Sequence, residues 1–245
     1  MKTILSVDVE GDWDSKETES LQIIPKLLDF FDDNRIKATF FAVGNLIKGN
    51  EDLFREISRK HELASHSFSH RRLDRLNLKE VEEEIVKSKK EIEKLKVKCI
   101  GFRAPFFIMH KELLQLLEKH KFVYDSSFSH SVFPGRYYNF NFRNNSKVVE
   151  LPISKFMWKL PLGLSYIRLF YPLSLGFLPK KGHMYIHPYE FMKDGPGKEI
   201  PAYVRELAKV RHGAKAWKIF EQVVSKMDCE FVGCRDYLKD RKDYI

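Results

Sequence analysis

The feature that most constrains the fold is a repeated alternation of short apolar, β-rich runs with segments of helical spacing. We expect β-strands at residues 3–9, 37–43, 62–65, 99–103 and 122–127. Between them, apolar residues recur with helical periodicity at 20–31, 51–60, 78–97 and 111–121. Strands and helices that alternate at this rhythm form βα units, which pack as a parallel sheet covered by helices. The sequence therefore predicts an α/β protein.

The alternation becomes less regular in the second half of the chain. We expect an aromatic and apolar excursion at about residues 129–180, including the strongly apolar segment 156–178. Further strands are expected at 148–153, 181–187 and 229–234, and a helix interrupted near its middle at 202–227. Prolines and charges within the apolar segment exclude a simple transmembrane helix. The segment is either a lid or core extension, or an interfacial patch that contacts lipid.

Length and charge limit the classes of partner. The 245 residues show no internal repeat or linker, so we expect one catalytic domain over residues 1–245. Lysine and arginine number 43 against 34 acidic residues, a formal net charge of +9, which favours anionic partners. No zinc-finger spacing or arginine–aromatic repeat indicates nucleic acid, and we expect none as a partner.

Cysteine content and the first residues suggest a cellular compartment. The three cysteines, Cys99, Cys229 and Cys234, contain no C-x2-C pair, which argues against a disulfide framework. The apolar run after Met1 is too short for a signal peptide and soon meets Asp8. We therefore expect a cytoplasmic protein, with peripheral contact at the inner membrane face as an option. Its oligomeric state has no sequence signature.

Polar residues fall at the carboxyl ends of the expected strands, where active sites of parallel α/β proteins lie. One such placement has simple structural explanations, such as a helix cap or a satisfied core histidine. Their recurrence in one chain is hard to explain by packing alone. The residues in question are Asp8, Glu10, His66, His70, Arg103, Asp125 and His187.

The spacing of two histidines indicates metal chemistry. His66 and His70 are four residues apart, so they share a face of either a helix or a strand. Two imidazoles and a carboxylate hold a divalent ion with open positions for water and a substrate carbonyl. A second carboxylate would serve as general base and a further histidine as acid. These residue types favour metal-assisted hydrolysis.

These motifs resemble the polysaccharide deacetylases of carbohydrate esterase family four, with the nodulation-type deacetylase homology domain. The resemblance extends from Thr3 to about Glu190. H-E-L-A-S-H-S-F-S-H, at residues 61–70, matches the family's metal motif closely. The other matching motifs are S-V-D-V-E (6–10), A-T-F-F-A-V-G (38–44), G-F-R-A-P-F (101–106), Y-D-S-S (124–127) and Y-I-H-P (185–188).

The resemblance implies a fold, a reaction and a set of roles. The fold would be a distorted, TIM-like (β/α) barrel of about seven parallel strands. The reaction would be removal of N-acetyl groups from an amino-sugar glycan or glycan precursor, releasing acetate. Roles carry over as follows: metal ligands Glu10, His66 and His70; general base Asp8, held by Arg103; acid His187; substrate-binding Pro105, Phe106, Tyr124 and Asp125.

The first motif departs from the family pattern. Many members have adjacent aspartates there, whereas this chain has Asp8-Val9-Glu10, so the division of roles between the two carboxylates stays open, and Asp12 could contribute. Two imidazoles and a carboxylate suit zinc best, with cobalt, nickel or iron as alternatives. The glycan is not readable; a lipid-linked or nucleotide-linked precursor is one option.

Two other classes of function remain open at this point. The chain could be another hydrolase, either a metal-free glycoside hydrolase with Asp8 and Glu10 as paired carboxylates or another amide hydrolase. The chain could also be a catalytically silent carbohydrate-binding protein on the same scaffold. Such a protein is expected to lack a ligand, the base or the acid, and this sequence has a candidate for each.

Overall fold

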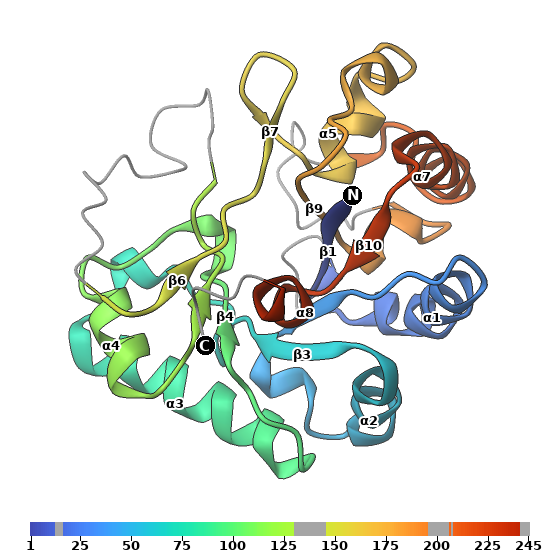
Figure 1. The fold of residues 1–245 in the computed structure, drawn as a ribbon. Helices are drawn as coiled ribbons and strands as arrows, with labels where there is room; N and C mark the ends of the chain where they lie inside the picture. The colour runs from blue at the N-terminus through green and yellow to red at the C-terminus, as the bar shows by residue number, and fades with distance from the viewer. Residues whose placement is uncertain (13–16, 130–145, 196–205, 207, 241–245) are drawn as a thin grey trace.

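The centre of the molecule is a strongly curled parallel sheet (Figure 1). The computed structural model describes residues 1–12, 17–129, 146–195, 206 and 208–240. Eight strands form the sheet in the order β10-β1-β2-β3-β4-β5-β6, with β9 also paired to β1, and every pairing is parallel. They are β1 (Lys2–Val9), β2 (Thr39–Ala42), β3 (Glu62–Ser65), β4 (Gly101–Phe102), β5 (Tyr124–Asp125), β6 (Val149–Glu150), β9 (His183–Ile186) and β10 (Glu230–Val232).

The sheet curls until its far edge approaches its beginning. Just beyond β6, the Ser154 N–H donates to the His183 carbonyl at 3.1 Å, and the His183 N–H donates to Ser154 Oγ at 2.8 Å. These bonds join the end of the β6 segment to β9, which is itself paired with β1. The expected distorted, TIM-like barrel is confirmed, and the structure has eight parallel strands where about seven were predicted.

Helices surround this sheet (Figure 1). The longer ones are α1 (Ile24–Asp33), α2 (Glu51–Lys60), α3 (Leu78–Lys94), α4 (Leu113–Lys119) and α7 (Ala214–Met227). Short 3₁₀ helices connect them: η2 (Glu19–Ile23), η3 (Gly44–Leu46), η4 (Leu73–Arg75), η5 (Pro105–Phe107), η6 (Leu173–Phe177) and η7 (Pro188–Phe191). In the described residues, no helix combines the length and apolar character needed to cross a bilayer.

The apolar segment 156–178 folds as short elements on one side of the barrel. They are the hairpin of β7 (Lys155–Phe156) and β8 (Leu160–Pro161), then α5 (Leu164–Leu169), then η6. Residues 130–145 of the predicted excursion lie outside the described part of the chain. The expectation that prolines exclude a spanning helix here is therefore consistent with the fold.

The alternation of side chains along β1 separates residues of the apolar core from residues of the candidate site. Successive side chains of a strand point to opposite faces. Leu5, Val7 and Val9 therefore face the helices and belong to the main apolar cluster. The intervening Ser6 and Asp8, like Glu10 just beyond the strand, are also buried, at 7% exposed or less. They face the barrel interior, where polar groups must find partners.

A small helix that the sequence did not reveal fills one end of the barrel. Cys234 and Leu238 of α8 (Cys234–Lys239) pack inside against Ile4, Phe41, Ala64, Tyr124 and Leu151. Gly101 makes room for this plug, because a Cβ there would lie 2.0 Å from the Tyr124 ring. The apolar plug leaves the opposite end, where the strands finish, for polar residues.

A buried histidine at the start of β3 gives a prediction about pH. The ring of His61 is 8% exposed and packs edge-on against Phe31 and tilted on Phe40, with centroids at 5.6 and 5.4 Å. Burial lowers the pKa of His61 to about 4, and the charge of Lys37 acts in the same direction. Below its ordinary pKa of 6.5 the unfolded chain therefore takes up a proton that the folded protein does not.

We expect this difference to cost about 2 kcal/mol of unfolding free energy at pH 5 and nothing above pH 7. His61→Phe should keep the packing and remove the titration. Urea unfolding at pH 7.5 and pH 5.0 measures the effect. The fall in stability between the two pH values should be about 2 kcal/mol smaller in the variant, and an unchanged fall would contradict the assignment.

Candidate active site

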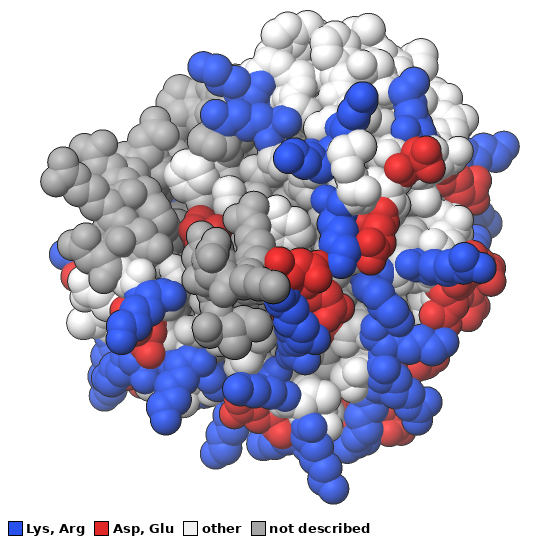
Figure 2. Space-filling view, in the orientation of Figure 1, with Lys and Arg blue, Asp and Glu red and all other residues white. Residues whose placement is uncertain are grey.

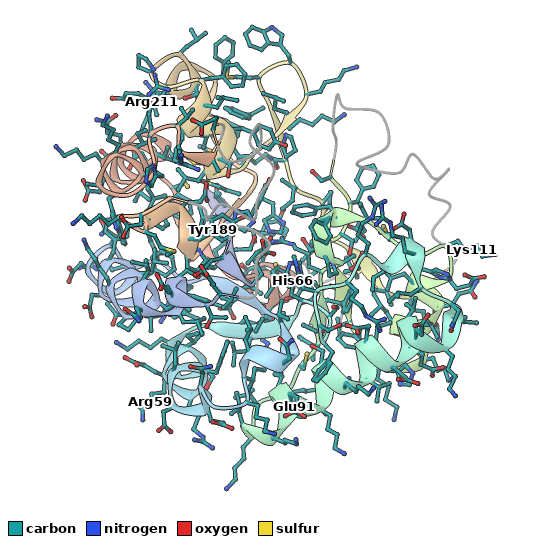
Figure 3. The ribbon with its side chains drawn as sticks, turned by 180° about the vertical axis from the view of Figure 1, so that it is seen from behind. Arg59, His66, Glu91, Lys111, Tyr189 and Arg211 are labelled. Atoms are coloured by element: carbon teal, nitrogen blue, oxygen red, sulfur yellow. The ribbon has the colours of Figure 1, made fainter. Side chains whose placement is uncertain are left out.

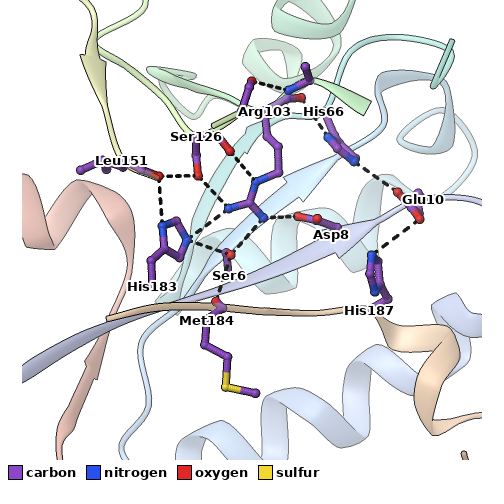
Figure 4. Close-up of polar contacts among 12 residues, drawn as sticks. Ser6, Asp8, Glu10, His66, Arg103, Ser126, Leu151, His183, Met184 and His187 are labelled. Atoms are coloured by element: carbon purple, nitrogen blue, oxygen red, sulfur yellow. Dashed lines mark hydrogen bonds and ion pairs between the residues drawn. The ribbon is translucent and has the colours of Figure 1, made fainter. Parts of the chain in front are cut away.

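Three predicted metal ligands, Glu10, His66 and His70, converge at the open end of the barrel. Figure 3 shows His66 near the centre of the molecule, and Figure 4 shows it beside Glu10. Glu10 Oε2 lies 3.2 Å from His66 Nε2 and 2.7 Å from His70 Nε2. One ligand atom from each residue falls within 4.8 Å of the others, and the carboxylate is 7% exposed. Burial raises the pKa of Glu10, but the neighbouring histidines, His70 first, outweigh it and hold that pKa well below its usual range.

The loop between the histidines is neither helix nor strand. Both Ser67 and His70 have positive φ, 62° and 57°, so the chain bends twice between the two rings. Glu84 of α3 holds these bends: it accepts hydrogen bonds from the Phe68 and Ser69 N–H groups at 2.9 and 2.8 Å. The two histidines were predicted to share a face of a helix or a strand. Instead, a loop held by α3 brings their rings together.

Glu84 is an exception among the acids of α3. Charged residues outside the apolar stripe of an amphipathic helix ordinarily lie on its solvated face, whereas Glu84 is 3% exposed and faces the loop. It also accepts from the hydroxyls of Ser67 and Ser69 at 3.0 and 2.6 Å. A carboxylate with this many donors fixes backbone geometry, so Glu84 positions the metal motif without reaching it. Nothing in the sequence period distinguishes it from its exposed neighbours.

The tautomer of His66 shows why a cation fits this cluster. His66 Nδ1 lies 2.9 Å from the Arg103 carbonyl, which can only accept, so Nδ1 carries the hydrogen. In neutral His66 the Nε2 lone pair then faces the Glu10 carboxylate at 3.2 Å. Two acceptors at that distance repel unless a positive charge lies between them. The donor set therefore suits a divalent ion held by two imidazoles and a carboxylate.

Arg103 and Asp8 form a buried ion pair beside the cluster (Figure 4). Arg103 Nη1 lies 2.5 Å from Asp8 Oδ1, and the two side chains are 0% and 2% exposed. Arg103 also donates from Nε to the Ser126 carbonyl at 3.1 Å and from Nη2 to Ser126 Oγ at 2.8 Å. Its guanidinium carbon lies 4.0 Å from the centroid of the Phe41 ring. These contacts fix both charges in place.

Two residues that sequence reasoning missed complete this pair. His183 Nε2 accepts from Arg103 Nη2 at 3.1 Å, which leaves Nδ1 to donate to the Leu151 carbonyl at 3.2 Å. Burial and the Arg103 charge lower the pKa of His183 well below its usual value, so the ring stays neutral. Ser6 Oγ accepts from Arg103 Nη1 at 3.0 Å. His183 lies two residues before Tyr185, on the same face of the strand. This two-residue spacing was the feature of the sequence that could have identified His183.

His187 stands on the other side of Glu10. Its Nε2 lies 3.8 Å from Glu10 Oε1, and its ring stacks on Tyr189 with centroids 4.6 Å apart and planes 12° apart. Tyr189 also donates its hydroxyl to Glu10 Oε1 at 3.4 Å. Burial lowers the pKa of His187, but the nearby Glu190 carboxylate and the charges of Glu10 and Asp8 outweigh it and raise that pKa to about 9.

A buried carboxylate from η7 orients His187. Glu190 Oε2 lies 3.6 Å from His187 Nδ1 and accepts from the His187 N–H at 2.9 Å. Its other oxygen accepts from Ser165 Oγ at 2.7 Å and pairs with Arg168 Nη2 at 3.2 Å. Glu190 and Arg168 are 0% and 1% exposed. Because Ser165 and Arg168 lie on α5, the apolar excursion helps to position the predicted acid.

We expect Glu190→Gln to lower the pKa of His187. The substitution removes the charge that the imidazolium faces, leaves burial to oppose protonation, and keeps the side-chain shape. The pKa should fall from about 9 by roughly one unit or more. A proton NMR titration of the metal-free protein measures it, with exposed Glu206→Gln as control. An unchanged His187 titration would show that Glu190 does not act on the ring.

The predicted substrate-binding residues separate into two pairs. Phe106 lies beside the cluster, its ring tilted on His70 with centroids 4.8 Å apart, and Pro105 precedes it in η5. Tyr124, in contrast, is fully buried in the plug at the other end of the barrel. Asp125 is also fully buried and accepts from Ser127 Oγ at 2.7 Å. A side chain without solvent access does not contact a glycan, so Tyr124 and Asp125 do not fit the predicted role.

Asp12 does not join the cluster either. Both of its carboxylate oxygens accept from the Ser20 N–H, each at 3.2 Å. That bond ties the end of the β1 segment to η2, where a carboxylate satisfies a free N–H. The suggestion that Asp12 could contribute a ligand is therefore not supported by its position.

Comparisons with known proteins point to one family. A family model described as polysaccharide deacetylase matches residues 13–124. The chain is 32% identical over 116 residues to a peptidoglycan deacetylase of Helicobacter pylori, covering 46% of this chain and 40% of that protein. It is 29% identical over 93 residues to a chitooligosaccharide deacetylase of a Bradyrhizobium strain, covering 37% and 42%. The matches thus span less than half the length of these relatives.

Solved structures show the same fold. A putative polysaccharide deacetylase from Mycobacterium smegmatis superposes with a TM-score of 0.65 at 18% identity, covering 98% of this chain and 89% of that one. A carbohydrate esterase family 4 pseudoenzyme from Bacillus anthracis superposes with a TM-score of 0.62 at 13% identity, covering 96% and 64%. At these identities the likeness concerns the fold alone, and it includes a protein described as catalytically silent.

Proposed function

We propose that this chain, which matches the polysaccharide deacetylase family model over residues 13–124, hydrolyses N-acetyl groups on an amino-sugar glycan, releasing acetate and a free amine. The observation that carries this proposal is the convergence of Glu10, His66 and His70 beside the Arg103–Asp8 pair. Amide hydrolysis needs an activated water, a polarised carbonyl and a proton for the leaving nitrogen. The cluster offers groups for each requirement.

We assign one divalent transition metal to Glu10, His66 and His70, with zinc as the favoured ion. Two imidazoles and a carboxylate match zinc's preference, and cobalt, nickel and iron accept the same donors. When bound, such an ion polarises a carbonyl and lowers the pKa of a coordinated water. His66 is prepared for this role because its bond to the Arg103 carbonyl directs Nε2 to the cluster.

The remaining residues divide the proton transfers. Asp8 is the general base: Arg103 fixes its Oδ1, and a carboxylate has a second oxygen that can accept a proton from water. His187 is the acid for the leaving amine. Its raised pKa keeps the imidazolium protonated at neutral pH, and Glu190 fixes its orientation. Arg103 and Glu190 are positioning residues in this scheme.

The alternatives fit the contacts less well. A metal-free glycoside hydrolase needs two carboxyl groups that act on the sugar. Here Asp8 is bound to Arg103, and Glu10 lies between two imidazoles. A silent binding protein would not need ligands, a base and an acid together, and the proximity of the residues that we propose for these roles supports an enzyme.

The first experiment is elemental analysis of freshly purified protein beside the His66→Ala/His70→Ala variant. We expect about one equivalent of a transition metal in the wild type and its loss in the variant. His120→Ala/His212→Ala, away from the cluster, is the matched control and should keep its metal. Acetate release from N-acetylated oligosaccharides should then stop with a chelator and return on reloading.

Two results would change the proposal. Wild-type protein that stays metal-free after incubation with zinc or cobalt would favour the carbohydrate-binding alternative. Turnover that survives complete metal removal would favour paired carboxylate chemistry. Glycan arrays and acetate assays with lipid-linked and nucleotide-linked N-acetylated sugars would identify the substrate, whose carrier we propose to be one of these two. A cytoplasmic location stays a prediction, for cell fractionation to test.

A further inference from the structure

An exposed apolar patch lies on the excursion, away from the metal cluster. Trp158, Leu173 and Phe177 are 67%, 57% and 47% exposed, and they are three of the seven large apolar side chains exposed in the described residues. The Trp158 and Phe177 rings touch, with centroids 6.1 Å apart. We call these three residues the apolar patch. Single exposed apolar residues are common, but a contiguous group marks a binding surface.

The fold holds the apolar patch outward. Met157, Trp158 and Lys159 all have positive φ at the turn of the β7–β8 hairpin, so this turn is tight. Phe156 and Leu160, the strand residues that flank it, are buried and fix the base of the hairpin. Figure 1 shows β7 and α5 projecting at the same edge of the molecule. The indole is therefore presented to solvent by a packed support.

The exposed charges of the stretch that carries the apolar patch have one sign. No aspartate or glutamate occurs between Glu150 and Glu190. This stretch carries four exposed lysines, and none of them forms an ion pair with a described residue. Figure 2 shows a broad uncharged surface at the top of the molecule, with basic side chains along much of its border and acidic ones at its right side. The lysines are Lys155, Lys159, Lys180 and Lys181.

We propose that the apolar patch and its lysines dock the protein on an anionic lipid surface. Tryptophan favours the boundary between headgroups and acyl chains, where its ring is apolar and its N–H stays hydrated. Leucine and phenylalanine beside it bury apolar area in the same layer. Each lysine near an anionic surface strengthens binding about fivefold. The absence of carboxylates from residues 151–189 lessens the repulsion that would otherwise oppose this attraction.

A second copy of the chain is a poorer occupant of the apolar patch. A two-fold interface places the same surface on both subunits, so the lysines of one patch would face those of the other. Like charges brought together in this way repel, and no acidic residue within the stretch is present to compensate. An anionic bilayer supplies the missing negative charge.

Vesicle binding tests this proposal without any catalytic assay, so its result is independent of the deacetylase proposal. The full chain is mixed with sucrose-loaded vesicles of phosphatidylcholine alone, or with 30% phosphatidylglycerol, roughly the anionic content that polybasic surfaces read. We expect sedimentation with the anionic vesicles only. Trp158→Ala/Phe177→Ala and Lys159→Glu/Lys180→Glu should each weaken it at least about tenfold.

Matched controls separate the apolar patch from general charge. Leu78→Ala/Val86→Ala and Lys90→Glu/Lys98→Glu alter exposed residues elsewhere and should bind anionic vesicles like the wild type. Circular dichroism confirms that each variant is folded. Wild-type protein that does not sediment, or equal losses in patch and control variants, would overturn the proposal. A dimer in sedimentation velocity that Trp158→Ala/Phe177→Ala dissociates would assign the patch to a second copy instead.

Discussion

Asp8→Asn is expected to abolish acetate release while the protein keeps its metal. Loss of a general base costs about 10²- to 10⁴-fold in rate. Asparagine has nearly the same shape as aspartate and its carbonyl can still accept from Arg103, so the surrounding structure should persist. Arg103 also retains its bonds to Ser126 and to Ser6. Elemental analysis and acetate assays on one preparation measure both quantities.

Glu10→Gln is the matched control, and we expect the opposite result: a loss of metal, with loss of turnover only as its consequence. The charge of Glu10 lies 3.2 and 2.7 Å from the two histidine Nε2 atoms, and an amide is a far weaker metal ligand. Metal content should fall first, with turnover following it and recovering in part at high metal concentration. If Asp8→Asn loses metal while Glu10→Gln keeps it, the roles that we assign to the two carboxylates are reversed.

These two variants address the departure in the first motif. Glutamate has one more methylene than aspartate, which allows Glu10, beyond the end of β1, to reach the histidines. Asp8 lies within the strand and points at Arg103. The alternation of a strand places both carboxylates on the inner face, two residues apart. Side-chain length and position therefore agree with the proposed division of roles, in which Glu10 is the ligand and Asp8 the base.

The fold could be predicted from the sequence because burial in parallel sheets leaves a clear pattern. The run at 62–65 and the helix at 51–60 match β3 and α2 residue for residue. Some predicted strands are shorter in the structure. The strand predicted at 122–127 is the two-residue strand β5. Helix α8 was missed, since Cys234 and Leu238 are too few to produce a helical period. Its role as a plug depends on a cavity that the sequence does not display.

The site could be predicted only as far as its chemistry is carried by distinctive residues. The histidine pair, Arg103 and the two β1 carboxylates were identified by position at strand ends, and the structure brings them together. Supporting residues carry no such signal. Glu84 is one of several acids on α3, and Glu190 is found only through its contacts with His187 and Arg168.

Tyr124 shows the opposite error. Its motif placed it with the substrate, but a tyrosine in a short strand can face either end of the barrel. Here Gly101 leaves a space that the ring fills, next to Phe41 at a centroid distance of 6.4 Å. The neighbour that decides its direction is distant in sequence. A family motif therefore fixes where such a residue lies along the chain, and packing decides whether it meets solvent.

Arg103→Met is expected to produce the largest loss of stability in the chain, about 3–5 kcal/mol. Methionine matches much of the volume and can pack on Phe41, but it leaves the Asp8 carboxylate buried without a counter-charge. The Ser126 carbonyl and hydroxyl also lose their donors. Urea unfolding at pH 7.5 measures the change. Arg55→Met, which breaks an exposed pair with Asp52, should cost under about 1 kcal/mol.

The double variant Asp8→Asn/Arg103→Met distinguishes a stranded charge from lost packing. If the uncompensated carboxylate causes the loss, neutralising it should return a substantial part of the stability, making the double variant more stable than Arg103→Met alone. If the two substitutions add instead, the loss comes from packing and from the bonds to Ser126. Activity should stay absent in either case, because the base is missing. A recovery of stability would therefore show that Arg103 stabilises the fold chiefly as the counter-charge of the buried Asp8 carboxylate.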